Sequence, residues 1–238
     1  MKPFEAWKII CSIHAQHPKT QRKFATAEHV TRQFISDHPN CYIAFSGGKD
    51  SSVVLDMARK IKSNLLAITS DDEWELPETT EILENTSFLK RIYRRTEHCS
   101  WFVSHKDLAA DNYNNTEKKL GFDACLLGLR ADENAYRKKY FKNYGIVHFA
   151  KSRNQWNCSP LAWWGVKDVW AYIFSKGVRY NKAYEVLEKI GVDPQYQRIG
   201  PFANRKALQF GQLARLKQGW PKLFNEFANK YPKARNYI

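Results

Sequence analysis

The chain has 238 residues, with 38 lysines and arginines against 24 aspartates and glutamates, so its formal net charge is +14. Hydrophobic residues make up 43% of the chain and aromatic residues 14%, which excludes a disordered protein. No apolar run approaches the roughly 20 residues of a membrane span, and the N-terminus lacks the apolar core of a signal peptide, so we expect a cytoplasmic globular protein.

Five cysteines are scattered along the chain without a C-x-x-C pair, which argues against a disulfide framework and against a local zinc site. They are Cys11, Cys41, Cys99, Cys125 and Cys158. We expect them to be small buried thiols in a reducing compartment. The positive net charge favours anionic partners such as nucleotides, nucleic acids or acidic surfaces.

The first quarter of the chain predicts a helix, a strand, a glycine turn and a second helix. Residues 27–37 carry apolar side chains at helical spacing, and Asp-His-Pro-Asn then ends that pattern. Residues 41–45 form a predicted buried strand. The glycine loop 46–52 follows directly, and residues 53–60 continue as a helix.

The alternation of strands and helices continues to about residue 150. The sequence predicts strands at 65–69, 101–103, 124–129 and 146–149, and helices at 77–93 and 105–120. Strands that alternate with helices and lack polar alternation indicate a parallel sheet covered on both faces. We therefore predict an α/β fold with a doubly wound, mostly parallel sheet, which binds ligands at the carboxyl ends of its strands.

The rest of the chain predicts helices at 166–176 and 180–190 and a basic, aromatic helical stretch at 205–230. No flexible linker separates these helices from the sheet. We therefore predict that residues 1–150 form a nucleotide-binding α/β domain with N-terminal helices, and that residues 151–238 form a mostly helical extension packed on it.

The glycine loop has the composition of an anion-binding site. Its residues are Ser46, Gly47, Gly48, Lys49, Asp50, Ser51 and Ser52. The glycines let the backbone approach an anion, the helix start offers unpaired N–H groups, and Lys49 and the serines add donors. Asp50 would repel a phosphate unless it caps the helix or faces a magnesium ion. The loop lacks the longer G-x-x-x-x-G-K-[ST] spacing of P-loop kinases and GTPases.

Four segments carry a resemblance to a known superfamily. Ser-Gly-Gly-Lys-Asp-Ser at 46–51 resembles the PP-loop of the ATP pyrophosphatase and adenine nucleotide alpha-hydrolase superfamily. The other three resemble its phosphoadenosine phosphosulfate (PAPS) reductase-like branch. They are the aspartate-containing segment with Pro-Glu-Thr at 69–79, a segment at 128–137 that resembles Gly-x-Arg-x-x-Glu-Ser-x-x-Arg with Asn134 in place of the serine, and a Pro-Leu-x-x-Trp-x-x-x-Asp-Val-Trp-like segment at 159–173.

The resemblance implies a site for an adenine nucleotide, either ATP or PAPS/adenylylsulfate, together with Mg²⁺. Residues 46–52 would cradle phosphate or sulfate, and Asp71 or Asp72 would lie near the ribose or a metal. Arg130 and Arg137 would reach the anionic groups, which suits the fixed fork of the guanidinium. Lys49, Asp50 and Arg130 are the residues to which the resemblance assigns catalysis.

The sequence departs from the family's reductases near its C-terminus. Those enzymes use a cysteine in a Glu-Cys-Gly-x-His setting, whereas no cysteine follows Cys158 here. Sulfur-transferring relatives carry additional cysteine pairs, and Ile-Gly-Pro-Phe at 199–202 occupies the stretch where some of them have these cysteines. We therefore expect adenylyl transfer, in which a substrate oxygen or nitrogen attacks the α-phosphate of ATP and releases pyrophosphate.

Two alternatives remain open at this point. One is a sulfonucleotide reductase that uses Cys125 or Cys158 as a displaced nucleophile. The other is a nucleic-acid-binding protein with a regulatory or silent nucleotide site, and an enzyme that activates a group on DNA or RNA combines this idea with adenylyl transfer. The basic clusters that suggest nucleic acid are Arg91, Arg94 and Arg95; Arg137, Lys138, Lys139 and Lys142; and Arg205, Lys206, Arg215, Lys217 and Lys222.

Aromatic residues lie between these basic residues, at Tyr136, Tyr140, Phe141, Tyr144, Phe210 and Trp220. The sequence leaves a homodimer or a partner subunit open. Small PAPS-reductase-like proteins without reductase cysteines are familiar from phages, so the resemblance is compatible with such an origin.

Overall fold

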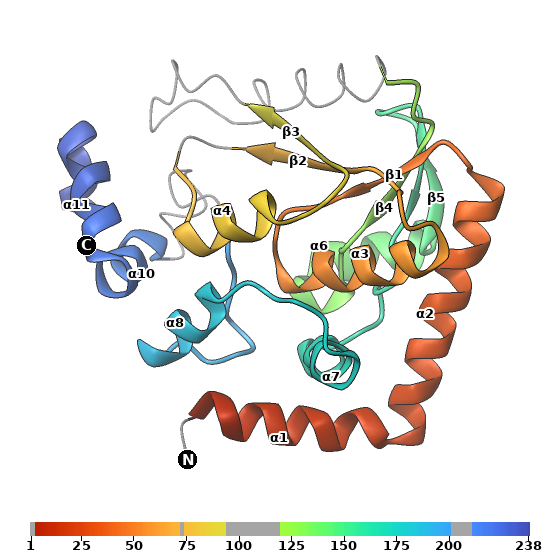
Figure 1. Cartoon of the computed structure of the whole chain (residues 1–238), viewed down its shortest axis with the longest axis horizontal. Coiled ribbons are helices and arrows are strands. Elements are labelled where there is room, and N and C mark those ends of the chain that lie inside the picture. The colour runs from red at the N-terminus through yellow and green to blue at the C-terminus, as the bar shows by residue number, and fades with distance from the viewer. Residues whose placement is uncertain (1–2, 72–73, 94–119, 201–210) are drawn as a thin grey trace.

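The computed structural model describes residues 3–71, 74–93, 120–200 and 211–238 (Figure 1). Its centre is one six-stranded sheet with the order β3-β2-β1-β4-β6-β5. The strands are β1 (Cys41–Ala44), β2 (Ala67–Asp71), β3 (Leu89–Tyr93), β4 (Ala124–Leu127), β5 (Val147–Ala150) and β6 (Gln155–Cys158). The strand predicted at 101–103 and nearly all of the helix predicted at 105–120 lie outside the described residues.

The pairing of the strands confirms the mostly parallel α/β sheet. Strand β1 pairs in parallel with both β2 and β4, so that Ile43 stands opposite Ala67 on one side and Leu126 on the other. The edge strand β5 alone, among the described strands, runs antiparallel to its neighbour. The chain moves outward from β1 to β3 and then returns to β4 on the other side of β1. The strand order therefore reverses between β1 and β4, where ligands bind to sheets of this kind.

The helices are gathered around this sheet, and Figure 1 shows α3 next to it, α7 beneath α3 and α1 beneath α7. They are α1 (Pro3–Gln16), α2 (Pro18–Asp37), α3 (Lys49–Ile61), α4 (Pro77–Glu84), α6 (Ala135–Tyr144), α7 (Val166–Lys176), α8 (Ala183–Lys189), α10 (Gln212–Gly219) and α11 (Pro221–Lys230). Short 3₁₀ helices occupy Ala131–Glu133 and Pro232–Tyr237. The predicted helical C-terminal region is thus present.

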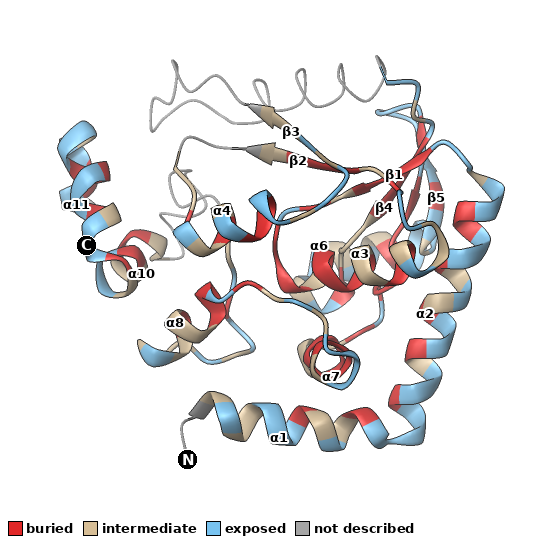
Figure 2. Ribbon diagram, in the orientation of Figure 1, coloured by how far each residue is buried: buried red, intermediate tan, exposed pale blue. Residues whose placement is uncertain are grey.

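One hydrophobic core joins the early and late parts of the chain. Buried side chains of α2, α3, β1, α7, α8 and α11 belong to the same cluster, which Figure 2 shows as red faces turned inward. At its centre the ring of Trp170 lies 5.8 Å from that of Phe4 and 5.2 Å from that of Tyr184. A smaller cluster around Tyr42, Ile68 and Cys125 fills the other face of the sheet.

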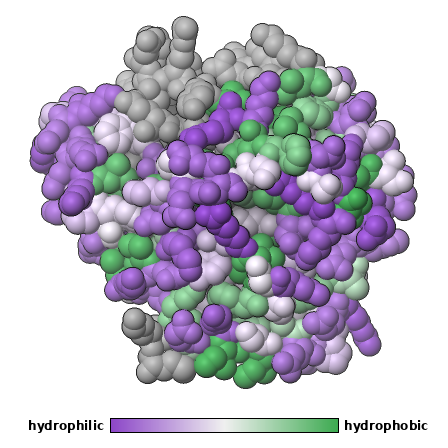
Figure 3. Space-filling model, in the orientation of Figure 1, coloured by the Kyte–Doolittle hydropathy of each residue, from purple (hydrophilic) through white to green (hydrophobic). Residues whose placement is uncertain are grey.

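The boundary predicted at residue 150 falls between β5 and β6, which are neighbours in the sheet. The division into two domains stays a prediction. The visible surface in Figure 3 is largely hydrophilic, with hydrophobic side chains in scattered groups. Among the described residues, none of the helices combines the length and apolar character needed to cross a lipid bilayer.

The structure corrects the helix predicted at 77–93, which ends at Glu84. The side chain of Asn85 donates to the carbonyl of Glu81 and that of Thr86 to the carbonyl of Ile82, so both compete for the last helical acceptors. Phe88 then adopts a positive φ of 46°, and residues 89–93 form β3 beside β2. A turn that local spacing did not reveal therefore converts the second half of the predicted helix into a strand.

Other elements also differ from the sequence prediction. The helix predicted at 27–37 begins at Pro18, and neither α6 nor β6 was predicted. The helical stretch predicted at 205–230 contains two helices, because the chain turns at Trp220 and α11 begins with Pro221, which has no N–H to continue α10.

Candidate functional site

The glycine loop leaves the carboxyl end of β1 and leads into α3. Gly47 has φ +69°, a conformation that favours glycine, and a Cβ there would lie 3.0 Å from Cγ2 of Ile82. The Ser51 hydroxyl donates to the carbonyl of Gly48 at 3.0 Å and accepts from the backbone N–H of Ser46 at 3.3 Å. The serine therefore holds the loop closed over the first turn of the helix.

The end of β4 packs against this first turn with almost no space between the backbones. A Cβ on Gly128 would lie 2.7 Å from the backbone nitrogen of Ser51 and 2.8 Å from the carbonyl carbon of Asp50. Glycine at this position thus lets the chain that follows β4 lie directly against the start of α3. The approach brings Arg130, two residues later, into contact with Asp50.

Asp50 is held between two cations. Its Oδ1 accepts from Nε of Arg130 at 2.5 Å, and its Oδ2 lies 3.4 Å from Nζ of Lys49. Burial opposes ionisation of the carboxyl, but the charges of Lys49 and Arg130 outweigh it and hold the pKa of Asp50 below its usual value. Asp50 is therefore an ionised carboxylate that orients Arg130, whose side chain is 5% exposed.

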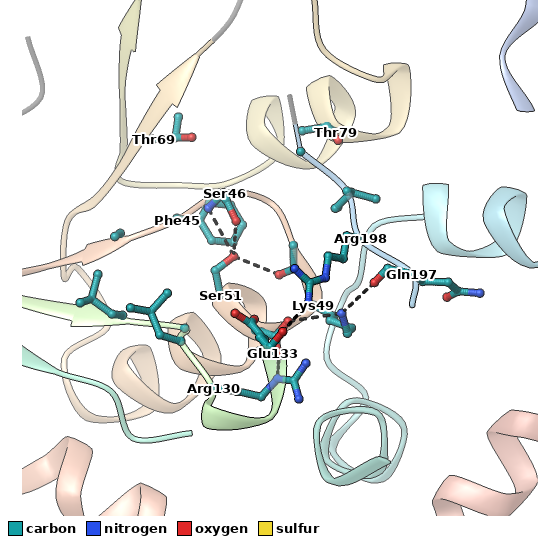
Figure 4. Close-up of a pocket in the computed structure, with 18 of the residues that line it drawn as sticks. Phe45, Ser46, Lys49, Ser51, Thr69, Thr79, Arg130, Glu133, Gln197 and Arg198 are labelled. Atoms are coloured by element: carbon teal, nitrogen blue, oxygen red, sulfur yellow. Dashed lines mark hydrogen bonds and ion pairs between the residues drawn. The ribbon is translucent and has the colours of Figure 1, made fainter. Parts of the chain in front are cut away.

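A cavity of about 520 Å³ opens above these residues, between the ends of β1, β2 and β4 and the segment 195–200 (Figure 4). Seven of the predicted site residues line it: Ser46, Gly48, Lys49, Asp50, Ser51, Arg130 and Arg137. Gly47 and Ser52 do not, and Ser52 lines a separate hollow with Asp56 and Arg59. Asp71 ends β2 beside the cavity residues Thr69 and Ser70. Asp72 lies outside the described residues.

Sequence reasoning missed the residues that close the cavity from the C-terminal side. The hydroxyl of Tyr184, in α8, accepts from the backbone N–H of Lys49 at 3.1 Å. The Nζ of Lys49 donates to the carbonyl of Gln197 at 3.2 Å and lies 5.1 Å from the centre of the Tyr184 ring. Gln197 and Arg198 directly precede residues 199–202, where some relatives carry cysteines. Their position in the sequence was therefore the one feature that could have indicated a role at the cavity.

Two further arginines meet at the cavity wall. Arg137 forms an ion pair with Glu133, and Arg198 donates to the backbone carbonyl of Glu133 at 3.0 Å. Burial lowers the pKa of Arg137, and the charges of Arg198 and Arg130 lower it further. The guanidinium groups thus crowd one another, and an anion in the cavity would relieve this repulsion.

The described carboxylates do not fit a magnesium site held by the protein itself. Four described carboxylates line the cavity, Asp50, Glu75, Asp132 and Glu133, and three of them, Asp50, Asp132 and Glu133, each form an ion pair with an arginine. Within the ranges that the structure describes, no group of three histidine, cysteine, aspartate or glutamate side chains could hold a metal ion. The charge that faces a ligand here comes from lysine and arginine.

None of the described cysteines lines the cavity. Cys11, Cys41, Cys125 and Cys158 are free and buried. Burial raises the pKa of the Cys41 thiol to about 11 and raises that of Cys158 further. Both are therefore protonated and poorly nucleophilic at neutral pH. Cys99 lies outside the described residues.

Comparisons with known proteins agree with this arrangement. Residues 40–207 match the family model of the phosphoadenosine phosphosulfate reductase domain. Sulfate adenylyltransferase subunit 2 of Vibrio parahaemolyticus is 24% identical, and the match covers 79% of this chain and 74% of that protein. An uncharacterized Methanocaldococcus jannaschii protein is 25% identical over 78% of this chain, which spans 46% of that protein's length.

Solved structures share the fold at low sequence identity. PAPS reductase from Candida auris, in a phosphate complex, has a TM-score of 0.58 and 21% identity, covering 74% of this chain and 88% of that chain. FMN adenylyltransferase of Candida glabrata in complex with ATP has a TM-score of 0.55 and 14% identity, covering 76% and 66%. The resemblance predicted from the glycine loop is confirmed, and the chain belongs to the phosphoadenosine phosphosulfate reductase domain family, whose members include enzymes.

Proposed function

We propose that this protein binds ATP in the 520 Å³ cavity and transfers its adenylyl group to an acceptor. An acceptor oxygen or nitrogen attacks the α-phosphorus, the bond to the β-phosphate oxygen breaks, pyrophosphate leaves, and the acceptor's proton passes to solvent. The observation that carries the proposal is the cavity wall itself. It combines the glycine loop, a helix start and three arginines, and none of the described cysteines lines it.

In this proposal the chain contributes positioning and charge. The glycine loop and the first turn of α3 bind phosphate oxygens with backbone N–H groups and serine hydroxyls. Lys49 exchanges its contact with the Gln197 carbonyl for a phosphate oxygen, because a charged partner is the stronger acceptor. Arg130, oriented by Asp50, stabilises the charge that develops at the α-phosphate, and Arg137 and Arg198 neutralise the leaving pyrophosphate.

The relatives support this choice by analogy. Sulfate adenylyltransferase subunit 2 and FMN adenylyltransferase are named for adenylyl transfer, and the latter is solved with ATP. The designation "subunit 2" also makes a partner subunit part of the proposal. Mg²⁺ would arrive bound to the nucleotide, since Asp50, Asp132 and Glu133 are paired with arginines and no group of three side chains that could hold a metal ion occurs among the described residues.

The test is incubation with Mg²⁺ and α-labelled ATP, alone and with sulfate, flavin mononucleotide, DNA or tRNA, followed by separation of labelled products and measurement of pyrophosphate. We expect pyrophosphate release that depends on one acceptor and is lost in Lys49→Ala. Lys176→Ala, which removes an exposed lysine at the end of α7, is the matched control and should retain activity. Absence of turnover with every acceptor, with ATP binding no tighter than PAPS, contradicts the proposal.

The second candidate is PAPS reduction, which the family model's name and the phosphate-bound Candida auris neighbour favour. It needs a cysteine nucleophile, and Cys125 and Cys158 are fully buried. Cys99→Ser, Cys125→Ser and Cys158→Ser, assayed for PAPS reduction with a dithiol reductant, separate the two candidates. Reduction by the wild-type protein that one of these changes abolishes would replace the first proposal.

A further inference from the structure

Helix α6 carries a stripe of three tyrosines on one face. Tyr136, Tyr140 and Tyr144 follow one another at intervals of four residues, so each lies about 6 Å from the next along the helix axis. Tyr136 is 77% exposed and Tyr144 is 60% exposed, and the rings of Tyr140 and Tyr144 lie 5.0 Å apart. Large aromatic surfaces are therefore held at regular spacing and turned toward solvent.

The middle tyrosine fixes the stripe to the sheet. The hydroxyl of Tyr140 lies 2.5 Å from Nε2 of His148, a buried residue of the edge strand β5, and the two rings meet edge to face at 5.0 Å. The ring of Tyr144 also lies 6.3 Å from that of His148. Tyr140 and Tyr144 are thus held in place, which lowers the entropy lost when a ligand stacks on them.

The same helix is entirely basic among its charged residues. Its ten residues include Arg137, Lys138, Lys139 and Lys142 and contain no aspartate or glutamate. The three lysines are exposed, and Lys139 lies one turn from Tyr136. The charge of Arg153, beyond β5, also acts on Tyr140. Aromatic rings that alternate with cations suit a chain of bases joined by phosphates.

The stripe begins beside the nucleotide cavity. Asn134 caps α6 by accepting from the backbone N–H of Arg137 at 2.8 Å, and both Glu133 and Arg137 line the cavity. Tyr136 therefore stands next to a residue of the cavity wall. Of the three basic clusters singled out in the sequence, this one is described in full, whereas Arg94, Arg95, Arg205 and Lys206 lie outside the described residues.

We propose that the tyrosine stripe of α6 binds single-stranded nucleic acid and leads the strand to the cavity, where a group on it accepts the adenylyl moiety. The last clause rests on the proposed function, and the binding does not. Single strands are favoured over duplexes because their bases are free to stack on tyrosine rings, whereas paired bases are already stacked. The lysines contact the phosphates and give no preference for sequence.

The test is fluorescence anisotropy with labelled 20-nucleotide single-stranded RNA, single-stranded DNA and duplex DNA, without ATP, at low and moderate salt. We expect the single strands to bind more tightly than the duplex. The double variant Tyr136→Ser/Tyr144→Ser should bind the single strands more weakly, with a loss of about fivefold for each tyrosine removed. Tyr136→Phe/Tyr144→Phe, which keeps the rings, should bind as the wild type does.

A triple variant, Lys138→Ala/Lys139→Ala/Lys142→Ala, should bind single-stranded RNA and single-stranded DNA more weakly, and its affinity should depend less on salt. Lys176→Ala should bind both as the wild type does. Thermal unfolding of each variant checks that the fold is kept, and the exposure of Tyr136 and Tyr144 makes this the expected result. Wild-type affinity in the serine double variant, or equal affinity for single strands and duplex, would overturn the inference. RNA binding without DNA binding, or the reverse, identifies the natural strand.

The two proposals fail separately. Strand binding that depends on the tyrosines, without pyrophosphate release for any acceptor, keeps the strand-binding part of this inference and removes adenylyl transfer. Pyrophosphate release with sulfate or flavin mononucleotide, combined with strand binding that is unchanged in the serine variant, keeps adenylyl transfer and removes this inference.

Discussion

Helices α3 and α7 begin in nearly the same way and serve different purposes. Both follow a glycine with extended backbone, Gly48 at φ −79° and ψ 160° and Gly165 at φ −80° and ψ 166°. Both carry an aspartate in the first turn that is paired with cations. The start of α3 opens onto the cavity, whereas the start of α7 is capped by its own aspartate.

The two helix starts differ because the aspartate is the third residue of α7 but the second residue of α3. Asp168 is the third residue of α7, so its Oδ2 reaches back to accept from the backbone N–H of Gly165 at 2.8 Å. His14 of α1 and Lys23 of α2 complete its shell at 2.8 and 2.5 Å. The carboxylate therefore ties three helices together and itself accepts from the backbone at this helix start.

Asp50 is the second residue of α3 and makes no such return contact. Its carboxylate turns to Arg130, on the other side of the topological switch point, and the hydroxyl of Tyr184 accepts from the backbone N–H of Lys49 instead. A glycine and an aspartate at a helix start therefore do not by themselves determine whether that helix start is capped or left open to a ligand. The outcome depends on the position of the aspartate within the first turn and on the residue from elsewhere in the chain that pairs with it.

The largest expected effect comes from Arg130→Met. It leaves the Asp50 carboxylate, which is only 14% exposed, with Lys49 as its remaining ion-pair partner, and this should destabilise the protein by about 3–5 kcal/mol. Urea unfolding measures the change. Arg179→Met is the matched control, because Arg179 and Glu81 form an exposed pair and should change stability by less than about 1 kcal/mol. Equal losses of stability in the two variants would show that the ion pair between Asp50 and Arg130 contributes no more to stability than an exposed ion pair does.

Asp168→Ala should cost about 2–3 kcal/mol, since the buried carboxylate bonds of Lys23, His14 and Gly165 are lost together. Nucleotide affinity, measured by calorimetry below the unfolding temperature, should stay at the wild-type value. A loss of nucleotide affinity in Asp168→Ala would mean that the contacts of Asp168 also shape the cavity, which would contradict the contrast between the two helix starts.

Gly128→Ala should destabilise the protein by about 2 kcal/mol, because the new methyl group meets backbone atoms of Ser51 and Asp50 that cannot rotate away. Gly165→Ala at the other helix start should cost less than about 1 kcal/mol, since the nearest atom, Oδ2 of Asp168, is 3.7 Å away. Thermal unfolding of both variants ranks them. The reverse order would contradict the close approach of β4 to α3.

The smallest effect concerns pH. Burial opposes ionisation of Asp168, but hydrogen bonds from Lys23, His14 and Gly165 outweigh it and hold its pKa below the usual value. A carboxyl with a lowered folded-state pKa contributes stability above its unfolded pKa, about 4, and loses it as the pH falls through the folded value. The urea concentration at the unfolding midpoint should therefore decrease as the pH is lowered below about 4, and it should decrease less steeply in Asp168→Asn. Parallel plots of midpoint against pH for the two proteins would contradict this assignment.

Local sequence predicted the elements whose signals lie within a few residues. The glycine loop after a buried strand placed the cavity at the end of β1, and Val166–Lys176 is a helix as its spacing indicated. The helix predicted at 77–93 failed because a turn at Asn85 and Phe88 redirects the chain, and β6 was missed because four residues, Gln155–Cys158, give too short a pattern. Short strands are recognised through their partners, which are distant in sequence.

The family, the parallel sheet and the loop that would hold an anion could be predicted from the sequence, because each depends on neighbouring residues and on a motif of fixed spacing. Which charges meet at that loop depends on the tertiary fold. Asp50 finds Arg130 at a separation of 80 residues, and Lys49 finds Tyr184 and Gln197 at separations of 135 and 148. Such contacts follow from the strand order and from the return of the C-terminal part of the chain to the start of α3, and no local pattern encodes them.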